Sequence, residues 1–409
     1  MAPSKEFSLA GKSLKLDTAE DIAPHIKPLA ELETVESVDF SGNTLGVGAS
    51  EALAKVLATK KSLTSANLAD IFTSRLLSEI PPAIDALLKA LLTLPNLHTV
   101  DLSDNAFGLN TCDPLVTFLS DHTPLEHLYL NNNGLGPIAG SKIADALATL
   151  AEKKGESKSK PLRTVVCGRN RLENGSMASW AKAYSRHTGV THIRMVQNGI
   201  RQEGITMLLK NGLKNVRGIQ VLELEDNTFT AMGSKALADI VSGWADLKIL
   251  NLNDCYLSAR GFTMFGESLR SGENKALEIM KLQYNNINSK GIQLLADIHQ
   301  FLPALRKVEL NGNKFSEDEV NVERLRENFE ERRVKAGAAE DDDEWGLDEL
   351  DELESDDEDE DDEEAAGDDE EEEHEEVLKR ADEAEEENVP QEKSKDVDKL
   401  ADMLGKTAI

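Results

Sequence analysis

One pattern of apolar and polar positions, LxxLxLxxN, recurs along most of the chain. Clear copies are LHTVDLSDN at 97–105, LEHLYLNNN at 125–133 and LRKVELNGN at 305–313, and LTSANLADI at 63–71 is a degenerate copy. Many successive copies lie about 28 residues apart. Apolar residues alternate with polar ones in the centre of each copy, and this alternation predicts a short strand with its apolar side facing a core.

The second half of each unit has the spacing of an amphipathic helix. In GSKIADALATLAEK, Ile143, Ala144, Leu147 and Leu150 fall on one helical face, and GSKALADIVSGW at 233–244 repeats the arrangement. A glycine stands near the start of this half, which we interpret as a tight turn that needs an unhindered backbone. These glycines are Gly48, Gly140, Gly204, Gly233, Gly261 and Gly291.

Repeated strand–turn–helix units predict a curved stack. Neighbouring strands lie about 4.8 Å apart, whereas packed helices need about 8–10 Å, so the strands must lie on the inner face. The expected fold is therefore an α/β leucine-rich-repeat solenoid, a horseshoe that resembles ribonuclease inhibitor, with parallel strands on its concave face and helices on its convex face. The closing asparagine of each unit can satisfy backbone groups of its own and the adjoining coil. These ladder residues are Asn43, Asn105, Asn133, Asn170, Asn198, Asn227, Asn285 and Asn313, with Cys255 replacing Asn once.

The pattern divides the chain into three parts. Residues 1–336 are expected to form the solenoid, closed by a helix within 319–337. Residues 337–393 are expected to be a disordered acidic tail, and 394–409 a short amphipathic segment. The basic stretch AEKKGESKSKP at 151–161 is expected to be an inserted loop.

Composition sharpens this division. The net charge of −31 is almost entirely a property of the tail, since 36 of the 76 acidic but only 6 of the 45 basic side chains follow residue 339. The chain shows no apolar stretch of membrane-spanning length and no signal peptide at its start, so we expect a cytoplasmic or perinuclear protein without membrane insertion. The three cysteines, widely spaced, fit ordinary thiols in a reducing compartment.

Signatures of a self-contained enzyme are missing from the sequence. The stretches GKS at 11–13 and GKT at 405–407 lack the opening glycine of a phosphate-binding loop. The histidines have no metal-ligand spacing, and no serine stands in a GxSxG context. The solenoid has no basic excess, which argues against direct nucleic-acid binding. We therefore expect a recognition protein with no metal and no cofactor of its own.

The residue before each ladder position is expected to form an exposed row, the turn-edge column. Asn132 and Arg169 interrupt a series of aspartates in this row, Arg171 lies beside them, and Arg75 lies on a projecting loop of the degenerate repeat. Each arginine can also be an ordinary solvated charge, and Asn132 can simply support its own turn. The column comprises Gly42, Asp70, Asp104, Asn132, Arg169, Gln197, Asp226, Asp254, Tyr284 and Gly312.

Several stretches resemble a known family. HTPLEHLYLNNNGLGP, CGRNRLENGS, DIFTSR and LNDCYLSARG, together with the acidic tail, are similar to the Ran GTPase-activating proteins in their fungal form. The resemblance spans about residues 7–335. The sequence contains no counterpart of the folded C-terminal domain of the animal members, which favours a soluble protein.

The resemblance implies an activator of GTP hydrolysis by the small GTPase Ran in nucleocytoplasmic transport. Asn132 matches the asparagine that holds the catalytic Gln of Ran, with no arginine finger inserted, and the GTP and Mg²⁺ belong to the GTPase. Arg75, Arg169 and Arg171 match positions that bind the surface of Ran, and Asn131 faces the same surface. A monomer is expected, with a Ran-binding protein and transport receptors as further partners.

Two other interpretations remain compatible with the sequence. The solenoid can be a passive scaffold that blocks a partner, as ribonuclease inhibitor does, or the chain can be an acidic histone-binding protein. The tail fits equally a solubilising extension or a segment that captures basic proteins. Catalytic stimulation of GTP turnover by Ran separates the activator from a passive scaffold.

Overall fold

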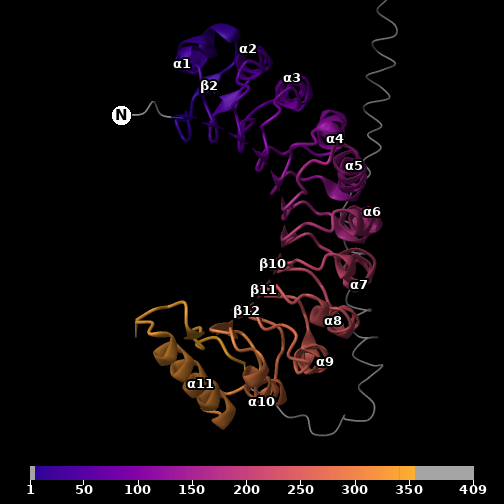
Figure 1. The fold of residues 1–409 in the computed structure, drawn as a ribbon, viewed down its shortest axis with the longest axis vertical. Coiled ribbons are helices and arrows are strands. Elements are labelled where there is room, and N and C mark those ends of the chain that lie inside the picture. Colours follow the sequence, from indigo (N-terminus) through magenta and orange to yellow (C-terminus); the bar gives the residue numbers. More distant parts are fainter. Residues whose placement is uncertain (1–4, 340, 355–409) are drawn as a thin grey trace, which may run out of the picture. The chain divides into compact units, whose positions relative to one another are not determined.

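The computed structural model describes residues 5–339 and 341–354. They belong to one compact unit, Met1–Asp356, and the amphipathic segment expected at 394–409 lies outside the described residues. Within this unit, strand–turn–helix coils follow one another along a curved array, with the helices on its outer side (Figure 1). The predicted α/β leucine-rich-repeat solenoid is confirmed.

The described strands form one long parallel sheet and one short pair. The short pair is β2 (Lys15–Leu16) with β4 (Thr44–Leu45). The long sheet contains, in spatial order, β1 (Glu6–Ser8), β3 (Ser37–Asp39), β5 (Ser65–Asn67), β6 (Thr99–Asp101), β7 (His127–Tyr129), β8 (Thr164–Val166), β9 (His192–Arg194), β10 (Val221–Glu223), β11 (Ile249–Asn251), β12 (Ile279–Lys281), β13 (Lys307–Glu309) and β14 (Gly346–Leu347).

Helices and helical turns line the outer side of the sheet. The π-helical stretch Leu208–Gly212 and the 3₁₀ turns Leu213–Asn215, Val241–Gly243 and His299–Phe301 continue some of them. The α-helices are α1 (Ala19–Glu31), α2 (Val47–Leu57), α3 (Ile80–Leu92), α4 (Cys112–Asp121), α5 (Gly136–Ser157), α6 (Glu173–Arg186), α7 (Gln202–Met207), α8 (Thr230–Ala238), α9 (Ser258–Leu269), α10 (Ser289–Ile298) and α11 (Val320–Ala336).

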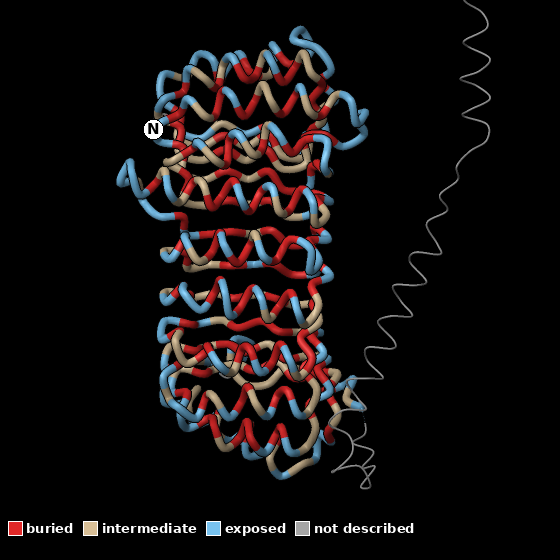
Figure 2. Tube along the Cα trace, turned by 90° about the vertical axis from the view of Figure 1, so that its right-hand side faces the viewer, coloured by how far each residue is buried: buried red, intermediate tan, exposed pale blue. Residues whose placement is uncertain are grey.

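The core lies between the sheet and the helices. Buried residues recur in every coil along the tube of Figure 2. Strand register aligns equivalent positions of the repeat, so Leu128 lies beside Val100 on one side and Val165 on the other. All three are at most 1% exposed. Burial of each such side chain stabilises the fold by about 1.5–3 kcal/mol, and the repeat supplies it once per coil.

Two helix boundaries differ from expectation. Helix α8 ends at Ala238, and the chain continues as a 3₁₀ turn, although Ile240 and Trp244 are still buried. The loop expected at 151–161 is wrong for 151–157, because α5 continues to Ser157, and only residues 158–161 lie outside a helix. Lys154 joins this end of the helix to the chain around it: its Nζ donates to the carbonyls of Thr123 and Lys160, both at 2.7 Å, and burial lowers its pKa to about 8.

The glycines near the helix starts serve packing and not tight turns. Gly140 is the fifth residue of α5 and Gly261 the fourth residue of α9, and neither has a positive φ. A Cβ at Gly140 would lie 2.6 Å from Cδ2 of Leu172, and one at Gly261 would lie 2.6 Å from Oγ of Ser234. The missing side chain therefore lets successive coils approach, and the tight-turn interpretation was wrong.

The C-terminal end of the solenoid extends further than expected. Helix α11 buries Val322, Leu325 and Phe329 against the last coil, as a closing helix should. Residues 341–354, assigned from sequence to a disordered tail, instead add β14 beside β13, with Leu347 opposite Val308. The boundary at 336 was therefore placed too early.

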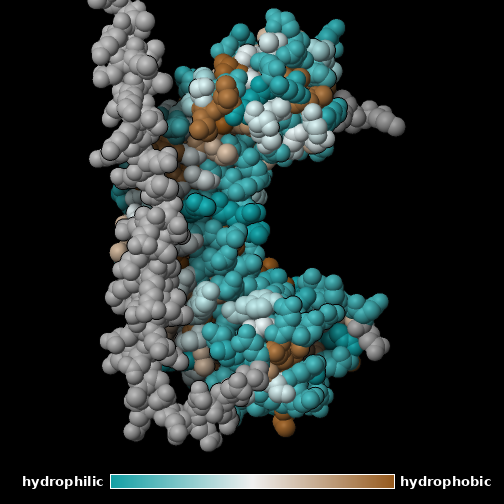
Figure 3. All heavy atoms as spheres, turned by 180° about the vertical axis from the view of Figure 1, so that it is seen from behind, coloured by the Kyte–Doolittle hydropathy of each residue, from teal (hydrophilic) through white to brown (hydrophobic). Residues whose placement is uncertain are grey.

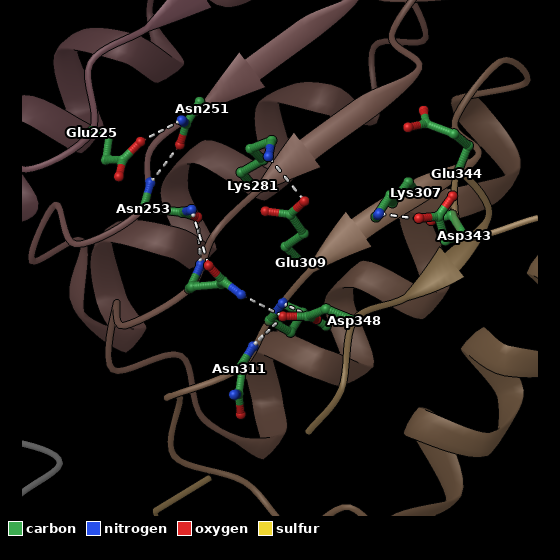
Figure 4. Close-up of polar contacts among 12 residues, drawn as sticks. Glu225, Asn251, Asn253, Lys281, Lys307, Glu309, Asn311, Asp343, Glu344 and Asp348 are labelled. Atoms are coloured by element: carbon green, nitrogen blue, oxygen red, sulfur yellow. Dashed lines mark hydrogen bonds and ion pairs between the residues drawn. The ribbon is translucent and has the colours of Figure 1, made fainter. Parts of the chain in front are cut away.

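Acidic side chains of this final segment bind backbone groups of the last coil (Figure 4). Asp348 accepts hydrogen bonds from the backbone N–H groups of Leu310, at 2.6 Å, and Asn311, at 3.1 Å. Leu350 is 8% exposed and joins the core. Composition alone predicted disorder here because it counts charges but does not see that an open sheet edge offers donors for carboxylates.

Candidate functional site

The turn-edge column has a left-handed backbone at every member. The angle φ is 61° at Asp104, 52° at Asn132 and 56° at Arg169, and it is positive at the other members as well. Glycine and asparagine adopt this conformation with little strain, which gives Asn132 a backbone reason to occupy the column. Each column member follows the strand of its own coil at the same distance along the chain. The side chains of the column therefore occupy equivalent places on neighbouring coils.

The ladder asparagines lie one residue further on and point inward. Asn133 is fully buried, and its Nδ2 donates to the carbonyls of Leu102 and Leu130, both at 3.0 Å. Its Oδ1 accepts from the backbone N–H of Asn105 at 2.9 Å. The predicted ladder residues are all buried, namely Asn43, Asn105, Asn133, Asn170, Asn198, Asn227, Asn285 and Asn313. Two neighbouring asparagines, Asn132 and Asn133, thus have opposite environments.

Asn132 is exposed and is tied to the preceding coil. Its Nδ2 donates to Oδ1 of Asp104 at 2.8 Å, and its backbone N–H donates to the carbonyl of Gly168 at 2.9 Å. Its Oδ1 accepts no hydrogen bond within the described residues. The amide therefore presents an acceptor and its second N–H to a partner.

Asn131 is half-buried and less available than expected. Its Oδ1 accepts from the backbone N–H of Gly168 at 2.8 Å, which joins this coil to the next. A Cβ at Gly168 would lie 2.7 Å from that oxygen. The Nδ2 of Asn131 forms no hydrogen bond with residues 5–339 and 341–354, so only this end of the amide is available to another protein.

Arg169 and Arg171 are both exposed and follow Asn132 on the next coil. Their φ angles are 56° and 52°, and the backbone N–H of Arg169 donates to the carbonyl of Val196 at 2.9 Å. Neither guanidinium has a hydrogen bond or an ion pair within the part of the chain that the structure describes. Two cations that pair with none of the described residues thus lie on the coil that follows Asn132.

Arg75 is turned inward, in contrast to the expectation that it faces a partner. Its side chain is 6% exposed and forms an ion pair with Asp17. Its Nε donates to Oγ1 of Thr44 at 2.9 Å, and its Nη2 donates to the carbonyls of Thr44, at 2.9 Å, and Leu16, at 3.3 Å. The loop does project, but its guanidinium connects the loop to the two preceding coils.

Three exposed apolar side chains, which were not predicted as site residues, lie on the coil of Asn132 and on the coil two before it. Leu76 and Leu77, on the projecting loop, are 68% and 66% exposed, and Ile138 at the start of α5 is 63% exposed. Elsewhere the surface is mostly hydrophilic in the view of Figure 3, where hydrophobic residues gather towards the two ends. The sequence signal was present, since LL at 76–77 falls outside the repeat pattern.

Acidic groups lie on both sides of the two arginines. Burial raises the pKa of Asp254, and the negative charges of Asp226 and Glu225 raise it further. Burial also raises the pKa of Asp101 on β6, with smaller contributions from Asp104 and Asp39. Arg169 and Arg171 thus form a local positive interruption of an acidic edge.

The described residues contain no group of three or more His, Cys, Asp or Glu side chains that could hold a metal ion. Among the helices of residues 5–339 and 341–354, none is long and apolar enough to cross a membrane. The chemistry available at the turn edge is therefore that of an exposed amide, two guanidinium groups and neighbouring carboxylates.

Solved structures similar to this chain include other repeat proteins. An internalin from Listeria monocytogenes aligns with a TM-score of 0.40 and 14% identity over 78% of this chain and 85% of its own. A leucine-rich-repeat protein from Legionella pneumophila gives 0.39 and 17%, over 77% of this chain and 96% of its own. These scores are too low to carry an argument, and the fold rests on the strand and helix geometry described above.

Sequence relatives are more informative. No family model matches the chain. Ran GTPase-activating protein 1 of Saccharomyces cerevisiae is 41% identical over 338 residues, which cover 80% of this chain and 83% of the yeast protein. The Ran GTPase-activating protein of Drosophila melanogaster is 32% identical over 318 residues, 76% of this chain and 53% of the fly protein. Ran GTPase-activating protein 1 of Xenopus laevis is 40% identical over 200 residues, 48% of this chain and 34% of the frog protein, so the chain spans a third to a half of these two relatives. With its repeats, its turn-edge column and its extended similarity to the yeast protein, this chain belongs to the family of Ran GTPase-activating proteins.

Proposed function

We propose that this protein accelerates the hydrolysis of GTP bound to Ran. The observation that carries the proposal is the exposed amide of Asn132, which has a free acceptor in a chain that is 41% identical to the yeast activator. The active site for hydrolysis belongs to Ran in this proposal, together with GTP and Mg²⁺. The activating protein contributes a surface and one positioned amide.

Phosphoryl transfer in GTPases depends mainly on positioning and on charge stabilisation. A glutamine of the GTPase orients the attacking water, and its side chain must be held in one rotamer for this task. The amide of Asn132 offers an acceptor and a donor side by side, so it can form two hydrogen bonds with a glutamine amide. Asn132 would thus lower the barrier by restricting the glutamine.

No arginine finger is part of this proposal. Arg75 was expected from the sequence to bind the surface of Ran, but its guanidinium already bonds Asp17, Thr44 and the carbonyl of Leu16. To reach a nucleotide, the guanidinium of Arg75 would have to break these hydrogen bonds and leave polar groups of two coils unsatisfied. We therefore assign Arg75 to holding the projecting loop, on which Leu76 is exposed to a partner.

Arg169 and Arg171 are proposed to bind the partner. Both are exposed without an intramolecular partner among the described residues, and guanidinium groups bind carboxylates well. The free Nδ2 of Asn131 can add a hydrogen bond at the same edge. Such contacts change affinity and association rate more than the rate of the bound complex.

The wider biological setting belongs to the same proposal. A role in nucleocytoplasmic transport, a cytoplasmic or perinuclear location, a monomeric state, and complexes with a Ran-binding protein and transport receptors are expected from the resemblance. The acidic tail is proposed to bind basic proteins, and it lies mostly outside the described residues.

Single-turnover release of phosphate from GTP-loaded Ran tests the proposal. Wild-type protein should accelerate release at catalytic amounts, and Asn132→Gly should abolish most of the acceleration even at saturation. Glycine suits the left-handed backbone, since Gly42 and Gly312 occupy the same column. Gln197→Gly is the matched control, because Gln197 is an exposed column member with φ of 52°.

Other outcomes would redirect the assignment. If the wild-type protein binds Ran without accelerating hydrolysis, it is a passive scaffold. If the Arg75→Ala variant folds normally but gives no acceleration when Ran is fully bound, Arg75 acts as an arginine finger. The mechanism in which Asn132 positions the glutamine is then wrong. If Arg169→Ala lowers the saturated rate and not the affinity, Arg169 acts in the reaction and not in binding.

A further inference from the structure

The hydrogen bond between Asp104 and Asn132 is a special feature of the turn-edge column. Within the described residues, no other pair of neighbouring column members is joined by a side-chain hydrogen bond. The carboxylate of Asp70, the preceding member, bonds Thr73 of its own loop. Tyr284, near the other end, bonds Glu352 of the C-terminal segment.

Backbone contacts hold Asp104 and Asn132 in place independently of this bond. The backbone N–H of Asp104 donates to the carbonyl of Asn131 at 2.9 Å, and that of Asn132 donates to Gly168 at 2.9 Å. Each residue has a left-handed φ that its own coil fixes. The side-chain bond is therefore not needed to build the column, and it acts on the orientation of the Asn132 amide.

An asparagine amide has two orientations that differ by a half-turn about its last bond. In one, Nδ2 faces the carboxylate of Asp104 and donates to it at 2.8 Å. In the other, Oδ1 would face a carboxylate, and two acceptors would repel each other. The carboxylate of Asp104 thus selects the orientation in which Oδ1 of Asn132 and the second N–H are presented outward.

We propose that Asp104 is a positioning residue that sets the orientation of the Asn132 amide for pairing with the catalytic glutamine of the GTPase. This inference rests on the proposed function. Without the carboxylate, the amide is distributed over both orientations, and only part of the population matches the glutamine. Asp104 itself need not touch the partner.

The test uses variants that suit the backbone. Asp104→Gly removes the carboxylate where glycine already stands in two other coils, and Asp104→Asn keeps an acceptor for Nδ2 of Asn132. Asp226→Gly is the matched control, because Asp226 is an acidic column member with φ of 53° and does not contact Asn132. Thermal unfolding of each variant verifies that the fold is retained.

The saturated single-turnover rate and the half-saturating concentration are measured separately. For Asp104→Gly we expect a rate at least about 2-fold lower with an almost unchanged half-saturating concentration, because the competent one of the two orientations is depleted. Asp104→Asn should recover most of the rate, and Asp226→Gly should equal wild type. In the Asn132→Gly background, Asp104→Gly should have no further effect.

Three results would overturn the inference. The first is an Asp104→Gly rate equal to wild type. The second is a change confined to the half-saturating concentration, which would mean that Asp104 steers the partner by charge. The third is an equal loss with and without Asn132, which would mean that Asp104 acts directly. If wild-type protein gives no acceleration, the proposed function itself fails, and that result is distinct from all three.

Discussion

Replacing Asn133 by alanine should strongly lower the free energy of unfolding of the solenoid, whereas replacing its neighbour Asn132 should change this free energy little. Asn133 is fully buried, and its amide makes three hydrogen bonds to backbone groups. Alanine makes none of them. The change therefore isolates the contribution of one ladder residue to the joining of adjacent coils.

The structure allows the loss to be worked out bond by bond. The carbonyl of Leu102 keeps a second donor in Nδ2 of Asn105, and that of Leu130 keeps Nδ2 of Asn170, both at 2.9 Å. Losing one of two bonds at each carbonyl costs about 0.5–1.5 kcal/mol. The backbone N–H of Asn105 loses the acceptor that Asn133 supplied and stays buried, which costs about 1–3 kcal/mol. The total is about 2–6 kcal/mol.

Urea unfolding followed by tryptophan fluorescence measures this loss, since Trp180 and Trp244 are buried in the coils. The urea midpoint should fall for Asn133→Ala. The free energy of unfolding of Asn132→Gly should stay within about 1 kcal/mol of the wild-type value, since this variant loses one exposed hydrogen bond. Equal midpoints for the two variants would refute the reasoning, because the ladder would then contribute no more than an exposed side chain.

Four further predictions concern stability. Arg75→Ala should destabilise the first coils by about 2–3 kcal/mol and speed hydrogen exchange at residues 14–17. Unchanged exchange at these residues would contradict the role of Arg75 in holding the projecting loop. Cys255→Asn should raise the free energy of unfolding by about 1 kcal/mol, and with it the urea midpoint, because an amide completes the ladder where a thiol now stands. A lower midpoint would show that Asn does not fit. Burial lowers the pKa of His187 to about 4 from 6.5, so the unfolded state takes up the proton first and stability falls between these two values as the pH falls. The His187→Phe variant should lose about 1 kcal/mol less than wild type between pH 7.5 and 5.5, and an identical pH dependence would exclude this role. Removing residues 341–409 should lower the midpoint by uncovering the edge of β13, and an unchanged midpoint would mean that β14 adds no stability.

The sequence by itself determined the repeating part of this protein. The strand, the turn and the helix each leave a local period, and every period is written once per coil of about 28 residues. The repeat also placed Asn133 inward and Asn132 outward, because the turn after each strand, with its left-handed backbone at Asn132, recurs at the same position of every unit. The resemblance to a family then added a role for Asn132 that no pattern contains.

The tertiary structure decided what depends on contacts between distant residues. Whether Arg75 faces solvent depends on Asp17, which lies 58 residues earlier in the chain. The end of α5 is held by carbonyls that accept from Lys154, and the need for Gly140 depends on Leu172 of the next coil. Composition treated residues 341–354 as part of a charged tail.

The physical reason is the range of the interactions. Local conformational preferences and hydrophobic periodicity act within one repeat, so they can be seen in a short stretch of sequence. Side-chain direction, helix ends and the pairing of a sheet edge are set by partners on neighbouring coils, whose positions exist only after the solenoid has formed. The bond from Asp104 to Asn132 is of this second kind, since it spans 28 residues and joins two side chains that each look ordinary alone.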